Sequence, residues 1–143
     1  LYLQYMQIQY TLILVAALAQ FILGAVWYSP LMFGNWWMKI MEVTHLSQEA
    51  LKKTQQQMLP FYGLQFVLTV MFTFVLMMFL SSLPEYWNNY GIAGFIWLGF
   101  IVPTQVAGVI WGSTKKNFWG LQIFIMTSYQ FVGLMIATYI LPM

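Results

Sequence analysis

The chain has 143 residues, of which 62% are hydrophobic and 6% charged, with a formal net charge of +2 and no cysteine. A soluble domain carries roughly 25% charged residues, so most of this surface must face lipid or other protein. The lack of cysteine excludes disulfides, thiolate metal ligands and cysteine nucleophiles. Five basic residues are also too few for a nucleic-acid-binding face. We therefore expect an all-α integral membrane protein, with one transmembrane domain over residues 1–143 and no nucleic-acid partner.

Four long stretches without charge cover residues 11–28, 61–83, 91–112 and 119–141. As helices, which rise about 1.5 Å per residue, they would be roughly 27 to 35 Å long, close to the ~30 Å of a hydrocarbon core. Prolines mark their limits: Pro30 follows the first stretch, Pro60 precedes the second and Pro84 follows it. Pro103 lies inside the third stretch, where a kink is expected. The sequence thus predicts a four-helix bundle.

The chain begins at Leu1, and Ala17-Leu18-Ala19 resembles a signal-peptidase site. No basic region precedes that site, and the apolar run continues to Tyr28, so we expect an uncleaved first span. Residues 1–9 alternate glutamine with apolar residues, and this pattern can extend the first helix beyond the membrane.

All five lysines fall in two connections, residues 29–60 and 113–118, at positions Lys39, Lys52, Lys53, Lys115 and Lys116. The positive-inside rule predicts that both connections are cytoplasmic and both termini lie outside. Within segment 31–58, residues 31–41 are apolar but too short to span. They predict a short interfacial helix or a shallow re-entrant segment. Ser47 is expected to cap a further, solvated helix.

Two internal echoes suggest that the four spans form two related hairpins. Gly24-Ala25-Val26-Trp27-Tyr28-Ser29 resembles residues 108–113, since both read G-x-[VI]-W-x-S. Residues 61–65 (FYGLQ) resemble residues 118–122 (FWGLQ). Both repeats have the same orientation, so a pseudo-twofold axis would run along the membrane normal. The alternative is coincidence in a chain rich in Phe, Leu and Trp.

Every predicted span contains glutamine, and these candidates for intramembrane polar contacts are Gln20, Gln65, Gln105, Gln122 and Gln130. An amide in hydrocarbon is unfavourable without a hydrogen-bond partner, and hydrogen bonds between helices are worth on the order of 1 kcal/mol. The residues either bind helices together or line a polar path inside the bundle. Small residues at helical spacing predict packing faces on three spans: Ala16, Thr104, Gly108, Gly112, Gly133 and Ala137.

The sequence offers no catalytic residues, metal ligands or cofactor site. His45 is the only histidine and has no second ligand of suitable type nearby. No G-x-S-x-G motif or Gly-rich phosphate loop occurs. We therefore expect a protein that is not an enzyme.

The first span ends in a motif that reads G-A-V-W-Y-S-P-L-M-F-G-N-W-W-M over residues 24–38. This motif resembles the signature of a bacterial membrane family known as domain of unknown function 1761, and Trp97-Leu98-Gly99-Phe100 is similar to the family's W-L-G-F segment. The resemblance covers nearly the whole chain. It implies a four-span fold and a bacterial inner-membrane location, but no activity.

The same motif supplies a candidate interface or binding surface, formed by Gly24, Trp27, Tyr28, Ser29, Pro30, Phe33, Gly34 and Trp37. Its proline stops the helix, its second glycine allows a close approach, and its aromatic residues gather at one end of the span. It either anchors the turn at the membrane surface or binds a lipid headgroup or a partner helix.

Three functional hypotheses follow. The first is a non-enzymatic protein that associates with itself or serves as an accessory subunit of a larger membrane complex. The second is a small transporter or channel for a neutral or lipidic solute, which needs a continuous polar path. The third is a lipid- or pigment-binding scaffold, suggested by an aromatic content of 20%.

Overall fold

The computed structural model describes residues 1–142, with residues 5 and 6 described by their backbone alone. The apolar stretches form long helices because the backbone polar groups of a segment in lipid must be satisfied within that segment. These helices are α1 (Tyr2–Trp27), α4 (Leu59–Ser81), a continuous helical run from Asn89 to Ile110, and α7 (Trp119–Ile140). All four are long and apolar enough to cross a membrane. The predicted all-helical fold with four spans is therefore confirmed.

The first helix is longer than the apolar stretch that predicted it. It begins at Tyr2 rather than near Thr11 and has 26 residues, which correspond to roughly 39 Å at 1.5 Å per residue. The Thr11 hydroxyl donates to the Gln7 carbonyl at 2.9 Å, so the turn before the apolar run is continuous with it. The glutamine-rich beginning of the chain thus extends the first helix.

The third span contains a wider turn in place of a simple proline kink. It consists of α5 (Asn89–Ile96), the π-helical turn η1 (Trp97–Ile101) and α6 (Val102–Ile110). The Val102 N–H donates to the Trp97 carbonyl, five residues back. Pro103, which follows, has no N–H to donate, and π turns commonly occur where the regular helical ladder is interrupted.

Two short helices occupy the long first connection. Helix α2 (Gly34–Ile40) lies within the predicted interfacial segment. Helix α3 (Gln48–Gln57) is capped by Ser47, whose Oγ accepts from the Ala50 N–H at 3.2 Å. The cap predicted for Ser47 is therefore confirmed. The second lysine-bearing connection is shorter and contains only one turn of 3₁₀ helix, η2 (Lys116–Phe118).

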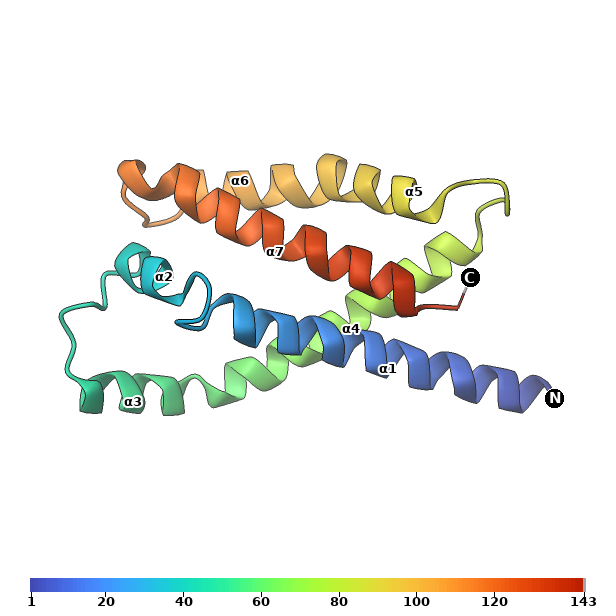
Figure 1. Cartoon of the computed structure of the whole chain (residues 1–143), viewed down its shortest axis with the longest axis horizontal. Coiled ribbons are helices and arrows are strands. Elements are labelled where there is room, and N and C mark those ends of the chain that lie inside the picture. The colour runs from blue at the N-terminus through green and yellow to red at the C-terminus, as the bar shows by residue number, and fades with distance from the viewer. Residues whose placement is uncertain (143) are drawn as a thin grey trace.

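The helices pack as two hairpins joined through their first and last members. Helix α1 packs on α4, α7 packs on α5 and α6, and α1 packs on α7. Both lysine-bearing connections lie at one end of the bundle, called the lysine end below, and both termini lie at the other, the terminal end (Figure 1). Glu42 and Lys115 form an ion pair that ties the two connections together and raises the pKa of Lys115. This arrangement is what the positive-inside rule requires, with both lysine-bearing connections on one side of the membrane and both termini on the other.

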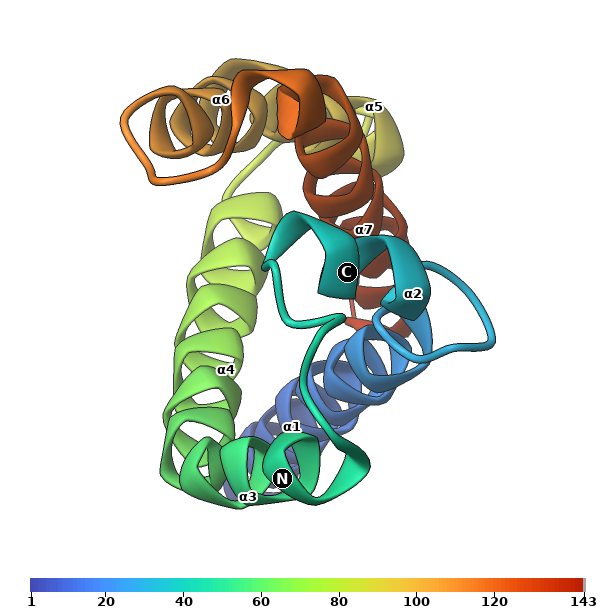
Figure 2. The same ribbon diagram turned by 90° about the vertical axis from the view of Figure 1, so that its left-hand side faces the viewer.

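Each end of the bundle has its own apolar core. The terminal end is filled from all the long helices, with Ile13, Leu76, Leu80, Leu134, Ala137 and Leu141 among its buried residues. At the lysine end the core is Trp27, Ile40 and Ile125, and α2 lies across that end beside α1 and α7 (Figure 2). Between these two cores lies the polar region described next.

Candidate functional site

A polar pocket, open on one side, lies between α1, α4 and α7, with a cavity volume of about 190 Å³. Its lining combines five hydrogen-bonding side chains with two apolar ones: Gln20, Gln65, Leu68, Thr69, Phe72, Tyr129 and Gln130. No lysine or glutamate lies in any of these three helices. The structure therefore brings three of the five predicted glutamines together around one uncharged cavity.

Gln20 joins the two helices of the first hairpin. It is 5% exposed, and its amide nitrogen donates to the Thr73 hydroxyl at 2.8 Å and to the Ala16 carbonyl at 3.1 Å. The Thr73 hydroxyl in turn donates to the Thr69 carbonyl at 2.7 Å. The donors of the Gln20 amide are thus committed to holding α1 against α4.

Tyr129 brings the third helix to the pocket. Its hydroxyl donates to the Gln20 main-chain carbonyl at 3.0 Å. Its ring packs edge-on to Tyr28 with centroids 5.7 Å apart and lies tilted against Trp27 at 6.4 Å. This packing holds the phenol between α7 and the end of α1.

The mouth of the pocket is formed by the two glutamines that keep free hydrogen-bonding capacity. Gln65 is exposed on α4, and its amide nitrogen lies 3.5 Å from the Thr69 hydroxyl, a long contact. Gln130 is half-buried on α7. Amides present both donors and acceptors, so the pocket is suited to a neutral molecule with both kinds of group.

The other two glutamines lie outside this pocket, on α6 and α7. The amide oxygens of Gln105 and Gln122 are both buried without a hydrogen-bond partner. Gln122 is 9% exposed, and Gln105 is half-buried. They belong to the second hairpin, whereas the pocket lies between the hairpins.

The aromatic motif after α1 packs against its own chain. The Trp27 indole N–H donates to the Ile125 carbonyl of α7 at 3.1 Å, and the Tyr28 and Trp37 rings meet edge-on at 4.8 Å. Phe33 packs against both Trp27, at 5.3 Å, and Phe124 of α7, at 6.0 Å. The motif residues therefore brace α2 and the end of α1 against the last helix.

The turn within this motif explains its serine, proline and second glycine. Ser29 donates from Oγ to the Val26 carbonyl at 2.6 Å, and its own carbonyl accepts from the Gly34 N–H at 2.8 Å. A Cβ at Gly34 would lie 2.4 Å from the Ser29 carbonyl carbon, so only glycine fits. Pro30 is exposed between these contacts.

The predicted small-residue faces divide into two groups. Ala16, Gly133 and Ala137 are buried in the contact between α1 and α7, where a Cβ at Gly133 would lie 3.6 Å from Gln20 Cγ. On α6, Thr104 and Gly108 are exposed, and a Cβ at Gly108 would meet nothing within 4 Å. Gly112, predicted to share their face, lies beyond the end of α6 at Ile110, where a Cβ would lie 2.8 Å from the Gly108 carbonyl oxygen. The chain itself thus leaves the α6 face uncovered.

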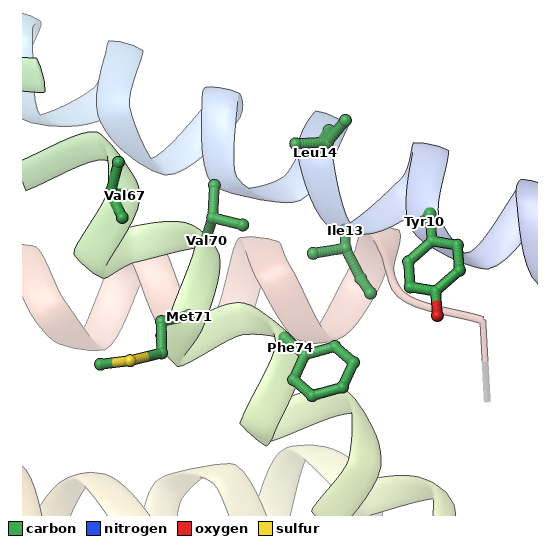
Figure 3. A pocket seen from close by; sticks show the side chains of 7 residues that line it. All are labelled: Tyr10, Ile13, Leu14, Val67, Val70, Met71 and Phe74. Carbon is green, nitrogen blue, oxygen red and sulfur yellow. The ribbon is translucent and has the colours of Figure 1, made fainter.

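A second cavity, of about 410 Å³, is an apolar groove between α1 and α4 (Figure 3). Tyr10, Ile13 and Leu14 line it from α1, and the residues from α4 are Val67, Val70, Met71 and Phe74. All of these except Ile13 and Val70 are exposed. In a bilayer such a groove lies open to lipid chains.

Sequence reasoning missed several residues that build the site. Thr69 and Thr73 continue the Gln65 face at four-residue spacing, a signal that was present in the sequence. Trp97 opens the π turn and donates its indole N–H to the Thr127 carbonyl at 2.8 Å, which fixes the third span against α7. Tyr129 gave no distinguishing local signal. Among the described residues, no three His, Asp or Glu side chains come together as a metal site would require.

Comparison with known proteins gives one family. A family model described as "Protein of unknown function (DUF1761)" matches residues 11–141. No curated protein and no solved structure matches the chain.

Proposed function

Because this chain belongs to the DUF1761 family, whose description assigns no function, we propose its role from its own geometry: it is a non-enzymatic membrane protein that binds a small uncharged molecule in the polar pocket between α1, α4 and α7. The observation that carries this proposal is the cluster of Gln20, Gln65, Thr69, Tyr129 and Gln130 around one cavity within membrane-spanning helices. Ligand sites typically combine an apolar lining with a few convergent polar groups.

The chemistry of the lining favours a neutral ligand. Ionisable side chains inside a membrane usually mark paths for ions or protons, and the pocket has none other than the phenol of Tyr129, which is already hydrogen-bonded. Gln65 and Gln130 each offer an amide N–H and a carbonyl oxygen. A small amide, a polyol, or the hydroxyl-bearing part of a neutral lipid has matching groups.

The arrangement favours binding over open conduction. Above Thr73 the terminal end is closed by packed apolar residues, among them Leu76, Leu80 and Leu134. The polar side chains of the pocket therefore do not continue into the terminal half of the bundle. Transport of a solute would require these packed helices to separate.

Thermal unfolding of the detergent-solubilised protein tests the proposal, with acetamide, urea and glycerol as neutral probes at millimolar concentration. We expect at least one probe to raise the melting temperature of the wild type and to lose this effect in Gln65→Leu and in Gln130→Leu. The matched control is Met71→Leu, which changes the lipid-facing side of α4. Equal shifts in the wild type and both pocket variants, or no shift at all, would refute the proposal.

A second candidate function is self-association, or assembly with another membrane subunit, through α6. Thr104 and Gly108 are four residues apart on α6 and form a face that this chain does not cover. Such small-residue faces allow close approach of helices in membranes. We expect the mass of the solubilised wild type to exceed that of a monomer and that of Gly108→Leu to fall to it. Gly63→Leu, at another open glycine, is the control, and a monomeric wild type would contradict this assignment.

A further inference from the structure

The polar pocket contains a hydrogen-bond acceptor that the chain leaves unused. Gln20 lines the pocket and is only 5% exposed. Both hydrogen bonds of its side chain are made by the amide nitrogen, to the Ala16 carbonyl and the Thr73 hydroxyl. In the described part of the chain, no donor reaches its amide oxygen. Native proteins usually satisfy such a group with water or a ligand, so the pocket has a place for an O–H or N–H donor beside Gln20.

Packed side chains close the pocket in both directions along the helices. Toward the terminal end, Leu76 and Leu134 belong to the apolar core of that end. Toward the lysine end, Ile125 is fully buried one turn of α7 away from Tyr129. Helix α1, which packs on both α4 and α7, closes a third side. The open side of the pocket therefore faces sideways, between α4 and the second hairpin.

Helix α4 stands apart from the second hairpin on that side. Its extensive contacts within the described chain are with α1 and α3. Figures 1 and 2 both show that α4 and α7 diverge toward the lysine end. From Leu59 to Leu68 every residue of α4 is exposed except Phe66, and the exposed side chains are apolar apart from Tyr62 and Gln65. An entrance for water would be lined by polar groups, so this side of the protein suits lipid chains.

The open side also lies at the depth of the hydrocarbon. Leu68 is nine residues beyond the start of α4 at Leu59, which corresponds to about 14 Å along the helix. Gln130 is eleven residues beyond the start of α7 at Trp119, or about 17 Å. A hydrocarbon core is ~30 Å thick, so both positions fall near its middle. A molecule that enters the pocket from this side comes from the bilayer.

We infer that the ligand of the pocket is a neutral amphiphile dissolved in the bilayer, which enters sideways between α4 and the second hairpin. A fatty alcohol, a monoacylglycerol and an isoprenoid alcohol all have this chemistry. The hydroxyl group donates to the Gln20 amide oxygen and exchanges hydrogen bonds with Gln65 and Gln130, while the hydrocarbon chain leaves the pocket past Leu68 and Phe72. The inference rests on the proposed binding function and adds to it the route of entry and the apolar body of the ligand.

Spin labelling tests the route of entry, and the lack of native cysteine makes single labels possible. Nitroxides are attached to Leu68→Cys at the opening, Met71→Cys on the lipid-facing side of α4 and Lys52→Cys on the solvated α3, and each protein is placed in lipid vesicles. Collision with oxygen reports exposure to lipid, and collision with a neutral nickel chelate reports exposure to water. We expect the label at 68 to resemble the label at 71. Chelate access at 68 as high as that at 52 would overturn the lateral opening.

Photo-crosslinking tests the class of ligand. A monoacylglycerol with a diazirine in its chain, at a fixed mole fraction in the vesicles, should label α4 around Leu68 and Phe72 and α7 around Gln130. Unlabelled monoacylglycerol should compete with it. The same lipid with its hydroxyls methylated should need a concentration about tenfold higher or more, because it has no donor for Gln20. Removing the donor from the ligand leaves the fold of the protein unchanged.

Two tryptophan variants separate the pocket from general contact with lipid. Leu68→Trp places a larger side chain at the opening and should reduce labelling around Gln130 several-fold. Val67→Trp, at the neighbouring position that lines the apolar groove instead, should leave this labelling unchanged. Monodisperse elution of both variants verifies their fold. Equal labelling in the two variants, or equal competition by the methylated lipid, would overturn the inference.

The outcomes distinguish this inference from the proposed function. If acetamide or glycerol stabilises the protein while the label at Leu68→Cys reports water, the pocket binds neutral solutes from water and only the lateral entry is wrong. If no soluble probe stabilises the protein and the photoreactive lipid does not label the pocket, the proposed binding function itself fails.

Discussion

Replacement of Gly24 by alanine tests how closely α1 approaches α7. A Cβ at this position would lie 3.0 Å from the Tyr129 hydroxyl oxygen and 3.3 Å from its Cζ, closer than ordinary van der Waals contact. The phenol cannot move freely, because its hydroxyl is bonded to the Gln20 carbonyl and its ring packs on Tyr28. Gly24→Ala should therefore displace Tyr129 and weaken this hydrogen bond.

The expected change in the free energy of unfolding combines two destabilising contributions and one stabilising contribution. Overpacking of a core costs about 1–3 kcal/mol, and loss of a neutral hydrogen bond costs about 1 kcal/mol. Alanine stabilises a helix interior over glycine by roughly 0.5–1 kcal/mol. We expect Gly24→Ala to lower the free energy of unfolding by about 1–3 kcal/mol. Gly108→Ala should raise it by up to about 1 kcal/mol, because nothing lies within 4 Å of its Cβ position.

Reversible unfolding in mixed detergent, followed by tryptophan fluorescence, measures both variants in the same assay. In a Tyr129→Phe background the nearest contact of the new methyl group is absent, so the penalty at position 24 should shrink by roughly 1 kcal/mol. The reasoning is refuted if Gly24→Ala is as stable as Gly108→Ala, since the two sites share one motif and differ only in their surroundings.

Three further changes have expected outcomes in the same unfolding assay. Gly34→Ala should cost about 2 kcal/mol or more, because the new methyl group would overlap main-chain atoms of the preceding turn; wild-type stability would contradict this. Trp97→Phe should cost about 1 kcal/mol, because the Thr127 carbonyl loses an indole donor, and an unchanged midpoint would count against that bond. Glu42→Gly should stabilise the end of α2, since Glu42 has a φ of 58°, which favours glycine. Lys115→Ala, which removes only the exposed ion pair, is its control, and a loss of stability in Glu42→Gly larger than in the control would contradict the backbone argument.

The spans could be predicted because charge and proline mark their ends. The second stretch was predicted at residues 61–83 and forms α4 at Leu59–Ser81, and the fourth was predicted at 119–141 and forms α7 at Trp119–Ile140. Hydrocarbon admits few alternatives to a helix for such a run. The start of α1 was harder to predict, because residues 1–9 carry no apolar run that would identify a span.

The inward faces could be predicted only where polar or small residues marked them. Helices α1, α4 and α7 are apolar on nearly all sides, so hydrophobic periodicity does not identify a buried side. Gln20 and Gly133, which were predicted as a polar contact and a packing residue without an assigned partner, meet in the α1–α7 contact. The same kind of signal at Gly108 identified a face that no helix of this chain covers. Small residues permit close packing, but the sequence does not identify the helix that packs against them.

The two copies of the G-x-[VI]-W motif show what decides whether a residue of a repeated pattern is buried or exposed. Trp27 is 9% exposed and bonded to α7, whereas Trp111, at the equivalent position, is 88% exposed. The first connection is long enough to form α2, whose Trp37 and Ile40 pack against the end of α1, while the second connection contains only one 3₁₀ turn. We infer that α2, absent from the second half, makes the first tryptophan part of the core.

That inference gives opposite expectations for two chemically identical changes. Trp27→Ala should lower the free energy of unfolding by about 3–5 kcal/mol, as for a buried aromatic residue, because it removes the ring between α1, α2 and α7 together with its hydrogen bond. Trp111→Ala should change it by no more than about 0.5 kcal/mol. Denaturation in mixed detergent measures both, with the intact variants first shown to be monodisperse. Similar losses in the two variants would mean that the repeated motif has equivalent roles in both halves, and that the contribution of α2 is not what separates them.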